Sequence, residues 1–270
     1  MDFKRIQIIF LITFVIIDIF LFSLFHRNQS VQNDSINSSN ATSIVSDMHN
    51  DQISFRHFPS DRKQTGYYIS ARKTNGLHKR LRTLSGQNIH YDSYHLDSTF
   101  KHPIALNDEH PHTTIDRLLQ RPSVIAYGDQ YHYCSNLSDP DTLVYVQRTH
   151  KNDIHNDIFS NTAEIKFHVV DHFLNGYSQS YVNNIKNLRE QSDTISAKRA
   201  LTLLYQYNNI PNNTKIEWCH FAYTHLLSVR GNYIYIPTWV IAMKENGADG
   251  IQYRDVNAFS GSIINTNSSD

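Results

Sequence analysis

Histidine is the side chain of this sequence best suited to chemistry, because it binds metals and titrates near neutral pH. The chain has 16 histidines, and the obvious pairs are His110 with His112 and His168 with His172. The run around His168 is typical of a strand, in which side chains four residues apart share a face but lie roughly 13 Å apart. One zinc ion cannot bind both side chains over that distance, and the sequence contains neither H-E-x-x-H nor paired C-x-x-C. We therefore expect no metal site and no cofactor.

Sequence signatures of covalent catalysis are absent as well. There is no G-x-S-x-G elbow and no phosphate-binding glycine loop. Cys134 and Cys219 do not lie in a protease context; a disulfide between them stays open, and we favour two buried free thiols. Asp139 and Asp141 flank a proline, so a turn explains this carboxylate pair better than glycosidase chemistry does. The sequence indicates that the protein is not an enzyme.

One stretch concentrates positive charge and could contact anionic wall polymers or lipid headgroups. It reads "ARKTNGLHKRLR", and its cations are Arg72, Lys73, Lys79, Arg80 and Arg82. We favour a solvated face for this stretch over a binding surface. The formal net charge of the whole chain is zero, so its charge gives no reason to expect a nucleic-acid partner.

The element that dominates the amino-terminal end is the apolar run "IIFLITFVIIDIFLFSLF" within residues 6–25. About 20 helical residues at a rise of about 1.5 Å match a hydrocarbon core of roughly 30 Å. No A-x-A-like cleavage site follows, so we expect an uncleaved transmembrane anchor. Lys4 and Arg5 precede the run and only Arg27 follows it closely, which favours a cytoplasmic amino terminus. The sequence thus predicts a single-pass protein of the cell membrane with its carboxy-terminal domain outside.

The rest of the chain is expected to form a stalk and one α+β domain. Asn/Ser-rich residues follow the anchor and carry few large apolar side chains, which indicates a flexible linker. About 220 residues then remain, enough for a domain with a real core. The predicted divisions are a cytoplasmic tip at 1–5, the helix at 6–25, the stalk at 26–52 and the outer domain at 53–270, with possible related subdomains at about 53–190 and 191–270.

Alternating patterns in the outer domain predict antiparallel sheets with a few helices. Strands are expected in "TGYYISARK", "NIHYDSYHL", "SVIAYGDQYHY", "TLVYVQRTH", "AEIKFHVVDHF", "TKIEWCHFAYTHLL", "NYIYIPTWVIAMK" and "GIQYRDVNAFSGSII". Asp139-Pro140 and Asn175-Gly176 are predicted turns, the latter at a hairpin. Helices are expected in "TTIDRLLQ", "SYVNNIKNLREQ" and "SDTISAKRALTLLYQY", the last capped by Ser192 or Asp193.

Asp18 is the one acid inside the apolar run. A carboxylate at the bilayer centre costs about 2.5 to 3.5 kcal/mol, so it must be neutral or have a partner. Written in heptads, the run places its polar groups on one seam, which we name the anchor seam. Its members are Gln7, Leu11, Phe14, Asp18, Leu21 and Phe25, preceded by Lys4. We favour a helix partner for this seam; the alternative is that Asp18 reaches toward the outer headgroups.

Both ends of the chain resemble the YycI (WalI) family. "MDFKRIQIIFLITFVIIDIFL" resembles its amino-terminal anchor. "ISAKRALTLLYQYNNIPNNTKI" resembles its carboxy-terminal helix, "IPTWVIAM" its Pro-x-Trp strand and "VNAFSG" its ending. The resemblance covers the anchor and roughly residues 171–265, and only the anchor carries over residue by residue. Family members often have an amide or another polar group near position 18, so the acid departs from the pattern.

The resemblance implies a membrane-anchored regulator in Gram-positive bacteria that acts with a companion, YycH. Their target would be the sensor histidine kinase WalK (YycG), which governs cell-wall metabolism, reached through contacts between membrane helices. The outer domain would resemble the last two domains of YycH, an α+β fold without catalytic residues. Two alternatives stay open: an anchored module that binds wall polymers through 72–82, and an anchored hydrolase, which the missing motifs disfavour.

Overall fold

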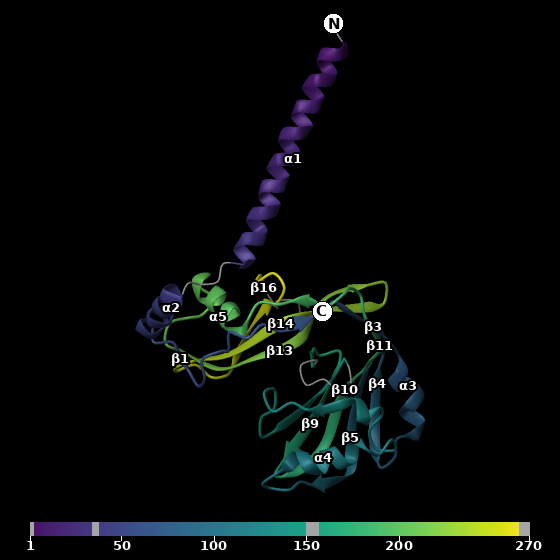
Figure 1. Ribbon diagram of the computed structural model, residues 1–270. Coiled ribbons are helices and arrows are strands. Elements are labelled where there is room, and N and C mark those ends of the chain that lie inside the picture. The colour runs from purple at the N-terminus through teal and green to yellow at the C-terminus, as the bar shows by residue number, and fades with distance from the viewer. Residues whose placement is uncertain (1–2, 34–37, 150–156, 265–270) are drawn as a thin grey trace. The chain divides into compact units, whose positions relative to one another are not determined.

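The computed structural model describes residues 3–33, 38–149 and 157–264, and the side-chain surroundings of 3–6, 9 and 24–43 are outside that description. The chain divides into two compact units, Met1–Gln52 and Ile53–Asp270. Each unit is described by itself below. Figure 1 shows the elements of both.

The first unit is helical. It contains α1 (Phe3–Asn33) and α2 (Ser38–Asn50), drawn in purple and blue in Figure 1. The large apolar side chains described on α1 are between 45 and 65 % exposed. Within the described residues, no helix is both long enough and apolar enough to cross a membrane. The side chains of 6, 9 and 24–25 in the predicted span are outside this description.

The described part of the predicted stalk is helical, where the sequence predicts a flexible linker. The end of α1 and the whole of α2 lie within 26–52. This stretch contains neither proline nor glycine, the residues that most strongly interrupt a helix. Its polar composition removes a reason to fold into a core, but it does not forbid local helix.

The second unit contains a six-stranded antiparallel sheet from the middle of the chain. Its strand order is β4-β5-β10-β9-β7-β6. The strands are β4 (Gln87–Asp92), β5 (His95–Ala105), β6 (Tyr131–Tyr133), β7 (Thr142–Gln147), β9 (Glu164–Val170) and β10 (Phe173–Ser180). The short helices α3 (Gly76–Arg80), η1 (Leu81–Thr83) and η2 (Gly128–Gln130) lie in its connections, with α4 (Pro111–Leu119).

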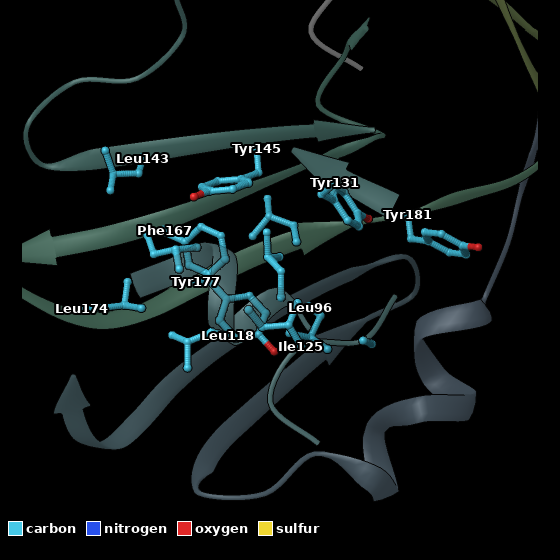
Figure 2. Packing of buried hydrophobic residues seen from close by; sticks show 14 of the residues in the cluster. Leu96, Leu118, Ile125, Tyr131, Leu143, Tyr145, Phe167, Leu174, Tyr177 and Tyr181 are labelled. Carbon is cyan, nitrogen blue, oxygen red and sulfur yellow. The ribbon is translucent and has the colours of Figure 1, made fainter. Parts of the chain in front are cut away.

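The core of this sheet combines aromatic and aliphatic side chains, as Figure 2 shows. The ring of Phe167 lies edge-on to Tyr145, with centroids 5.2 Å apart, and tilts against Tyr177 at 5.6 Å. Pro111 starts α4 at a position where the missing amide hydrogen has no cost, and three residues of this helix pack into the core: Ile115, Leu118 and Leu119. Tyr145 ties β7 to α4, since its hydroxyl donates to Asp116 Oδ1 at 3.0 Å.

An eight-stranded sheet gathers strands from both ends of the second unit. Its main path is β1-β13-β14-β15-β16; β3 joins β14, β11 joins β3, and β8 joins β13. The strands are β1 (Ser54–Phe55), β3 (Ile69–Lys73), β8 (Ile158–Phe159), β11 (Val182–Asn187), β13 (Thr214–Val229), β14 (Asn232–Glu245), β15 (Gln252–Asn257) and β16 (Ile263–Ile264). A separate pair joins β2 (Thr65–Gly66) to β12 (Ser192–Asp193).

The predicted α+β class with antiparallel sheets and few helices is confirmed. The predicted helices at "TTIDRLLQ" and "SDTISAKRALTLLYQY" correspond to α4 and α5 (Ala197–Gln206). Each precedes a meander of antiparallel strands. The subdomain boundary near residue 190 stays a prediction. Strand pairing crosses this boundary, because β1 pairs with β13, β2 with β12 and β3 with β14.

Three local predictions are wrong. "SYVNNIKNLREQ" contains the strand β11 and no helix. The amino-terminal cap of α5 is Ser196, whose Oγ accepts the Arg199 N–H, and not Ser192 or Asp193. The Asn175-Gly176 pair lies inside β10; the hairpin turn is at Asp171–His172, with φ of 49° and 66°. Gly176 is needed there for space, since a Cβ would meet the Ser98 carbonyl oxygen. The predicted Asp139-Pro140 turn is confirmed, with the Thr142 N–H bonded to Asp139 Oδ1 at 2.7 Å.

Candidate functional site

The anchor seam lies on α1, a continuous helix. Spacings of three and four residues place its members along one helix face. Leu11, Phe14 and Leu21 are 65, 59 and 55 % exposed. Gln7 and Asp18 are exposed too, while the side chain of Phe25 is outside the described residues. The described seam side chains are thus accessible, as a surface for a helix partner requires.

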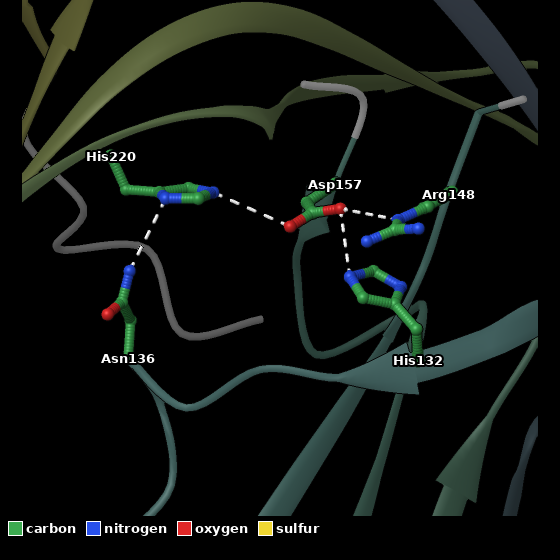
Figure 3. A network of polar contacts seen from close by, with 5 residues as sticks. All are labelled: His132, Asn136, Arg148, Asp157 and His220. Carbon is green, nitrogen blue, oxygen red and sulfur yellow. Dashed lines mark hydrogen bonds and ion pairs between the residues drawn. The ribbon is translucent and has the colours of Figure 1, made fainter. Parts of the chain in front are cut away.

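A polar cluster that the sequence did not predict is buried in the second unit. Its centre is Asp157, 5 % exposed, immediately before β8. His132 comes from β6 and Arg148 follows β7, both at the edge of the six-stranded sheet. His220 comes from β13 of the eight-stranded sheet. We call these four residues the Asp157 cluster; it joins side chains from both sheets (Figure 3).

The carboxylate of Asp157 is shared among three nitrogen atoms. His132 Nε2 lies 3.0 Å and Arg148 Nε 3.1 Å from Oδ1. His220 Nε2 lies 3.4 Å from Oδ2, an ion-pair contact without hydrogen-bond geometry. Burial alone would raise the pKa of Asp157, but the interactions with His132, His220 and Arg148 outweigh it and hold the pKa well below its usual range. The carboxylate is therefore ionised at neutral pH.

Neighbouring groups fix the histidine of β13. Asn136 Nδ2 lies 3.3 Å from His220 Nδ1, and the ring of Phe159 stacks on the imidazole at 5.0 Å. The Tyr223 N–H donates to the Asp157 carbonyl at 2.7 Å, which holds the start of β8 beside β13. The cluster can therefore clamp the two sheets together through a single charge.

A serine, a histidine and an aspartate also meet at the paired strands β5 and β10. His95 Nδ1 lies 3.0 Å from Ser180 Oγ, and His95 Nε2 lies 3.3 Å from Asp97 Oδ1. The side chains of His95 and Asp97 are 48 and 55 % exposed, so water competes for this ion pair. A hydrolytic triad keeps its aspartate buried, and we interpret these contacts as one hydrogen bond between strands and one exposed ion pair.

The histidine pairs of the sequence are not brought together at a metal. His168 is exposed on β9 and His172 lies in the following turn, beside Asp108 at 3.3 Å. His112 stacks on Tyr133, with centroids 4.9 Å apart. Over residues 3–33, 38–149 and 157–264 no group of three potential ligands is placed to hold an ion.

The two cysteines are free thiols, Cys134 buried and Cys219 partly exposed. Burial raises the pKa of Cys134 to about 11, so its thiol is protonated at neutral pH. The favoured prediction of two free thiols over a disulfide holds, although the residue exposure of Cys219 is intermediate.

The basic stretch is exposed at all five of its cations. Two of them pack on aromatic rings: Lys73 Nζ lies 4.2 Å from the centroid of Tyr94, and the Arg80 guanidinium 5.4 Å from that of Tyr127. These cation–π contacts fix part of the stretch without covering its charge.

No motif marks the Asp157 cluster, because its members lie on separate elements and share no regular spacing. Arg148 and Asp157 become neighbours through an isolated β-bridge, and His220 joins them when β8 pairs with β13. Only the topology brings these residues together.

The comparison with protein families agrees with the sequence resemblance. A family model described as YycI protein matches residues 31–259, most of the chain. No curated protein matches. Among solved structures, an uncharacterized protein from Eubacterium rectale is 8 % identical at a TM-score of 0.44, covering 80 % of this chain and 91 % of that one. The YpeB C-terminal domain of Bacillus megaterium is 10 % identical at a TM-score of 0.35, covering 84 % and 95 %.

Proposed function

Since the chain belongs to the YycI family, whose members are non-catalytic regulators of the WalK/YycG two-component system, we propose that it controls the kinase itself through helix contacts in the membrane. The observation that carries this proposal is the family match over 31–259. In this proposal the protein is a single-pass protein of the cell membrane of a Gram-positive bacterium. Its amino terminus is cytoplasmic, and the second unit lies outside with a YycH-like companion.

The anchor seam supports the proposed contact with the kinase. The described seam residues are exposed on α1, and Asp18 adds a group that gains from a hydrogen-bonding partner in lipid. These features give the helix a reason to bind another helix specifically.

The mechanism we propose is a population shift. The helix would bind one arrangement of the kinase helices more tightly than another, and only this difference in binding free energy changes the kinase. A difference of about 1.4 kcal/mol changes the ratio of the two states tenfold. The sign of regulation follows from which arrangement is favoured.

Replacement of the helix tests this proposal. Residues 6–25 are exchanged for an unrelated apolar helix of equal length, and kinase phosphorylation is measured in membranes that contain the companion. We expect regulation to be lost, since the seam is lost. The matched control changes the off-seam residues Ile12 and Ile16 to leucine and should regulate normally. Unchanged regulation after the exchange would contradict the proposal.

The exposed cations of 72–82 favour one second candidate, an anchored module that binds anionic wall polymers. Under this alternative the helix exchange changes nothing, whereas Arg72→Gln combined with Lys79→Gln and Arg82→Gln abolishes co-sedimentation with wall polymer. Under the kinase proposal this triple variant regulates like the wild type. The two experiments together separate the two functions.

A further inference from the structure

A cleft of about 470 Å³ opens beside the Asp157 cluster, in the size range of sites for small ligands. It lies between two strands from different sheets. Tyr131 and His132 of β6 line it on one side, and Asn183 to Ile185 of β11 on the other. Arg148 and Tyr181 contribute to the same walls.

Both strands that line the cleft are edge strands. Among the described strands, β6 pairs with β7 alone, and β11 pairs with β3 alone. The ladder between β11 and β3 is also interrupted, because its register shifts between Asn183 and Lys186. Asn184 and Ile185 lie in that interruption, and both line the cleft. Edge strands carry backbone N–H and C=O groups that an extended peptide can use.

Two lining residues also hold buried polar atoms that lack a hydrogen-bond partner among the residues that the structure describes. These are His132 Nδ1 and Asn183 Oδ1. The Asn183 amide has one long contact, from Nδ2 to Thr74 Oγ1 at 3.4 Å, so it is weakly held and can turn toward the cleft. A buried polar atom without a partner costs about 1 to 3 kcal/mol, which a ligand can recover.

One lining side chain is suited to a ligand with one negative charge, the guanidinium of Arg148. Arg148 uses Nε for Asp157, and no described residue bonds its two terminal nitrogen atoms, which can therefore hold a planar anion. Asp157 behind it and Asp129 on the lining offset much of the positive charge, so a dianion such as phosphate is disfavoured. A single carboxylate matches the fork of Arg148 and meets less repulsion from these two acids than a dianion does.

We propose that the cleft between β6 and β11 binds a short extended peptide that ends in a free carboxylate, held by the terminal nitrogens of Arg148, while the peptide amides pair with the strand edges and Asn183. This inference concerns the second unit alone and does not depend on the proposed function. It assigns a ligand class to residues that no motif of the sequence identified.

Calorimetric titration of the full chain in detergent tests the proposal. The probes are trialanine and its carboxy-terminal amide, which differ only in the terminal charge. We expect trialanine to bind with a dissociation constant below about 1 mM and the amide to bind at least about tenfold more weakly. No heat with either probe would overturn the proposal. Equal binding of the two probes, or inorganic phosphate binding as tightly as trialanine, would overturn it as well.

Variants locate the site. Arg148→Lys keeps the charge but removes the planar fork, and Asn183→Leu fills the cleft without touching the Asp157 cluster. Both should weaken trialanine binding about tenfold or more, while Arg121→Lys, outside the cleft, should bind normally. Thermal unfolding of each variant confirms that it is folded. Full affinity in a folded Asn183→Leu protein would place the peptide elsewhere and contradict the assignment.

Discussion

At the scale of single residues, one buried carboxylate joins strands of the two sheets in the second unit. Asp157 contacts His132 and Arg148 from one sheet and His220 from the other. Because the side chain of Asp157 is 7 % exposed, water cannot replace these partners. The removal of a single partner from such a buried pair is strongly destabilising, since it leaves the other charge uncompensated.

We expect Asp157→Asn to lower the free energy of unfolding by about 3 kcal/mol at pH 7. The folded pKa of Asp157 is lower than its ordinary value of 3.8, so its contribution is present above about pH 4 and is lost as the pH falls further. Urea unfolding from pH 3 to pH 7 measures this. The difference between wild type and variant should shrink toward pH 3.

The control for that measurement is Asp108→Asn, since the side chain of Asp108 is 81 % exposed. It should change stability little at any pH. If the difference in the free energy of unfolding between Asp157→Asn and wild type stays constant down to pH 3, Asp157 is not an ionised, paired carboxylate.

Asp255 gives the opposite pH dependence. It is 6 % exposed, and burial raises its pKa to about 6. The pKa of Asp255 is higher in the folded than in the unfolded protein. The contribution of Asp255 to stability is therefore most favourable below about pH 4 and becomes less favourable as the pH rises to about 6. Asp255→Asn should therefore stabilise the protein by about 2 kcal/mol at pH 7 and not at pH 4, as measured by urea unfolding. Asp249→Asn, at an exposed position, is the control, and a destabilised Asp255→Asn protein at pH 7 would refute the prediction.

At the scale of elements, the start of α5 differs between the sequence prediction and the structure. Ser196 Oγ accepts the Arg199 N–H at 3.2 Å and donates to Asp61 Oδ1 at 2.9 Å, whereas Ser192 lies in β12. Ser196→Ala should cost about 1 kcal/mol in thermal or urea unfolding, and Ser192→Ala should cost little. The reverse order of the two variants would show that the helix begins earlier.

Helices with a clear apolar face were predictable, and irregular strands were not. The core-facing residues Ala197, Ala200, Leu201 and Leu204 of α5 recur at helical spacing and are buried. In β11, Val182 and Ile185 are also three apart, but there the spacing comes from the irregular register against β3. An extra residue in a strand places apolar side chains three positions apart, as in a helix. Only the pairing with another strand shows that the segment is a strand.

At the scale of the whole molecule, the α+β class and the family followed from patterns along the chain, but the polar sites did not. The anchor seam is local, so heptad spacing identifies it. The Asp157 cluster and the cleft depend on contacts between residues tens of positions apart, such as Arg148 with His220 through Asp157. No periodicity of a single sequence contains those contacts.

Photocrosslinking in membranes is the most direct test of whether the anchor seam binds the kinase. A photoreactive residue is placed at Phe14 or Leu21, with Asp18 intact or changed to leucine, and kinase autophosphorylation is measured in the same membranes. We expect a crosslink to the kinase that weakens in Asp18→Leu together with a change in phosphorylation. The absence of any crosslink, with phosphorylation unchanged by Asp18→Leu, would contradict it.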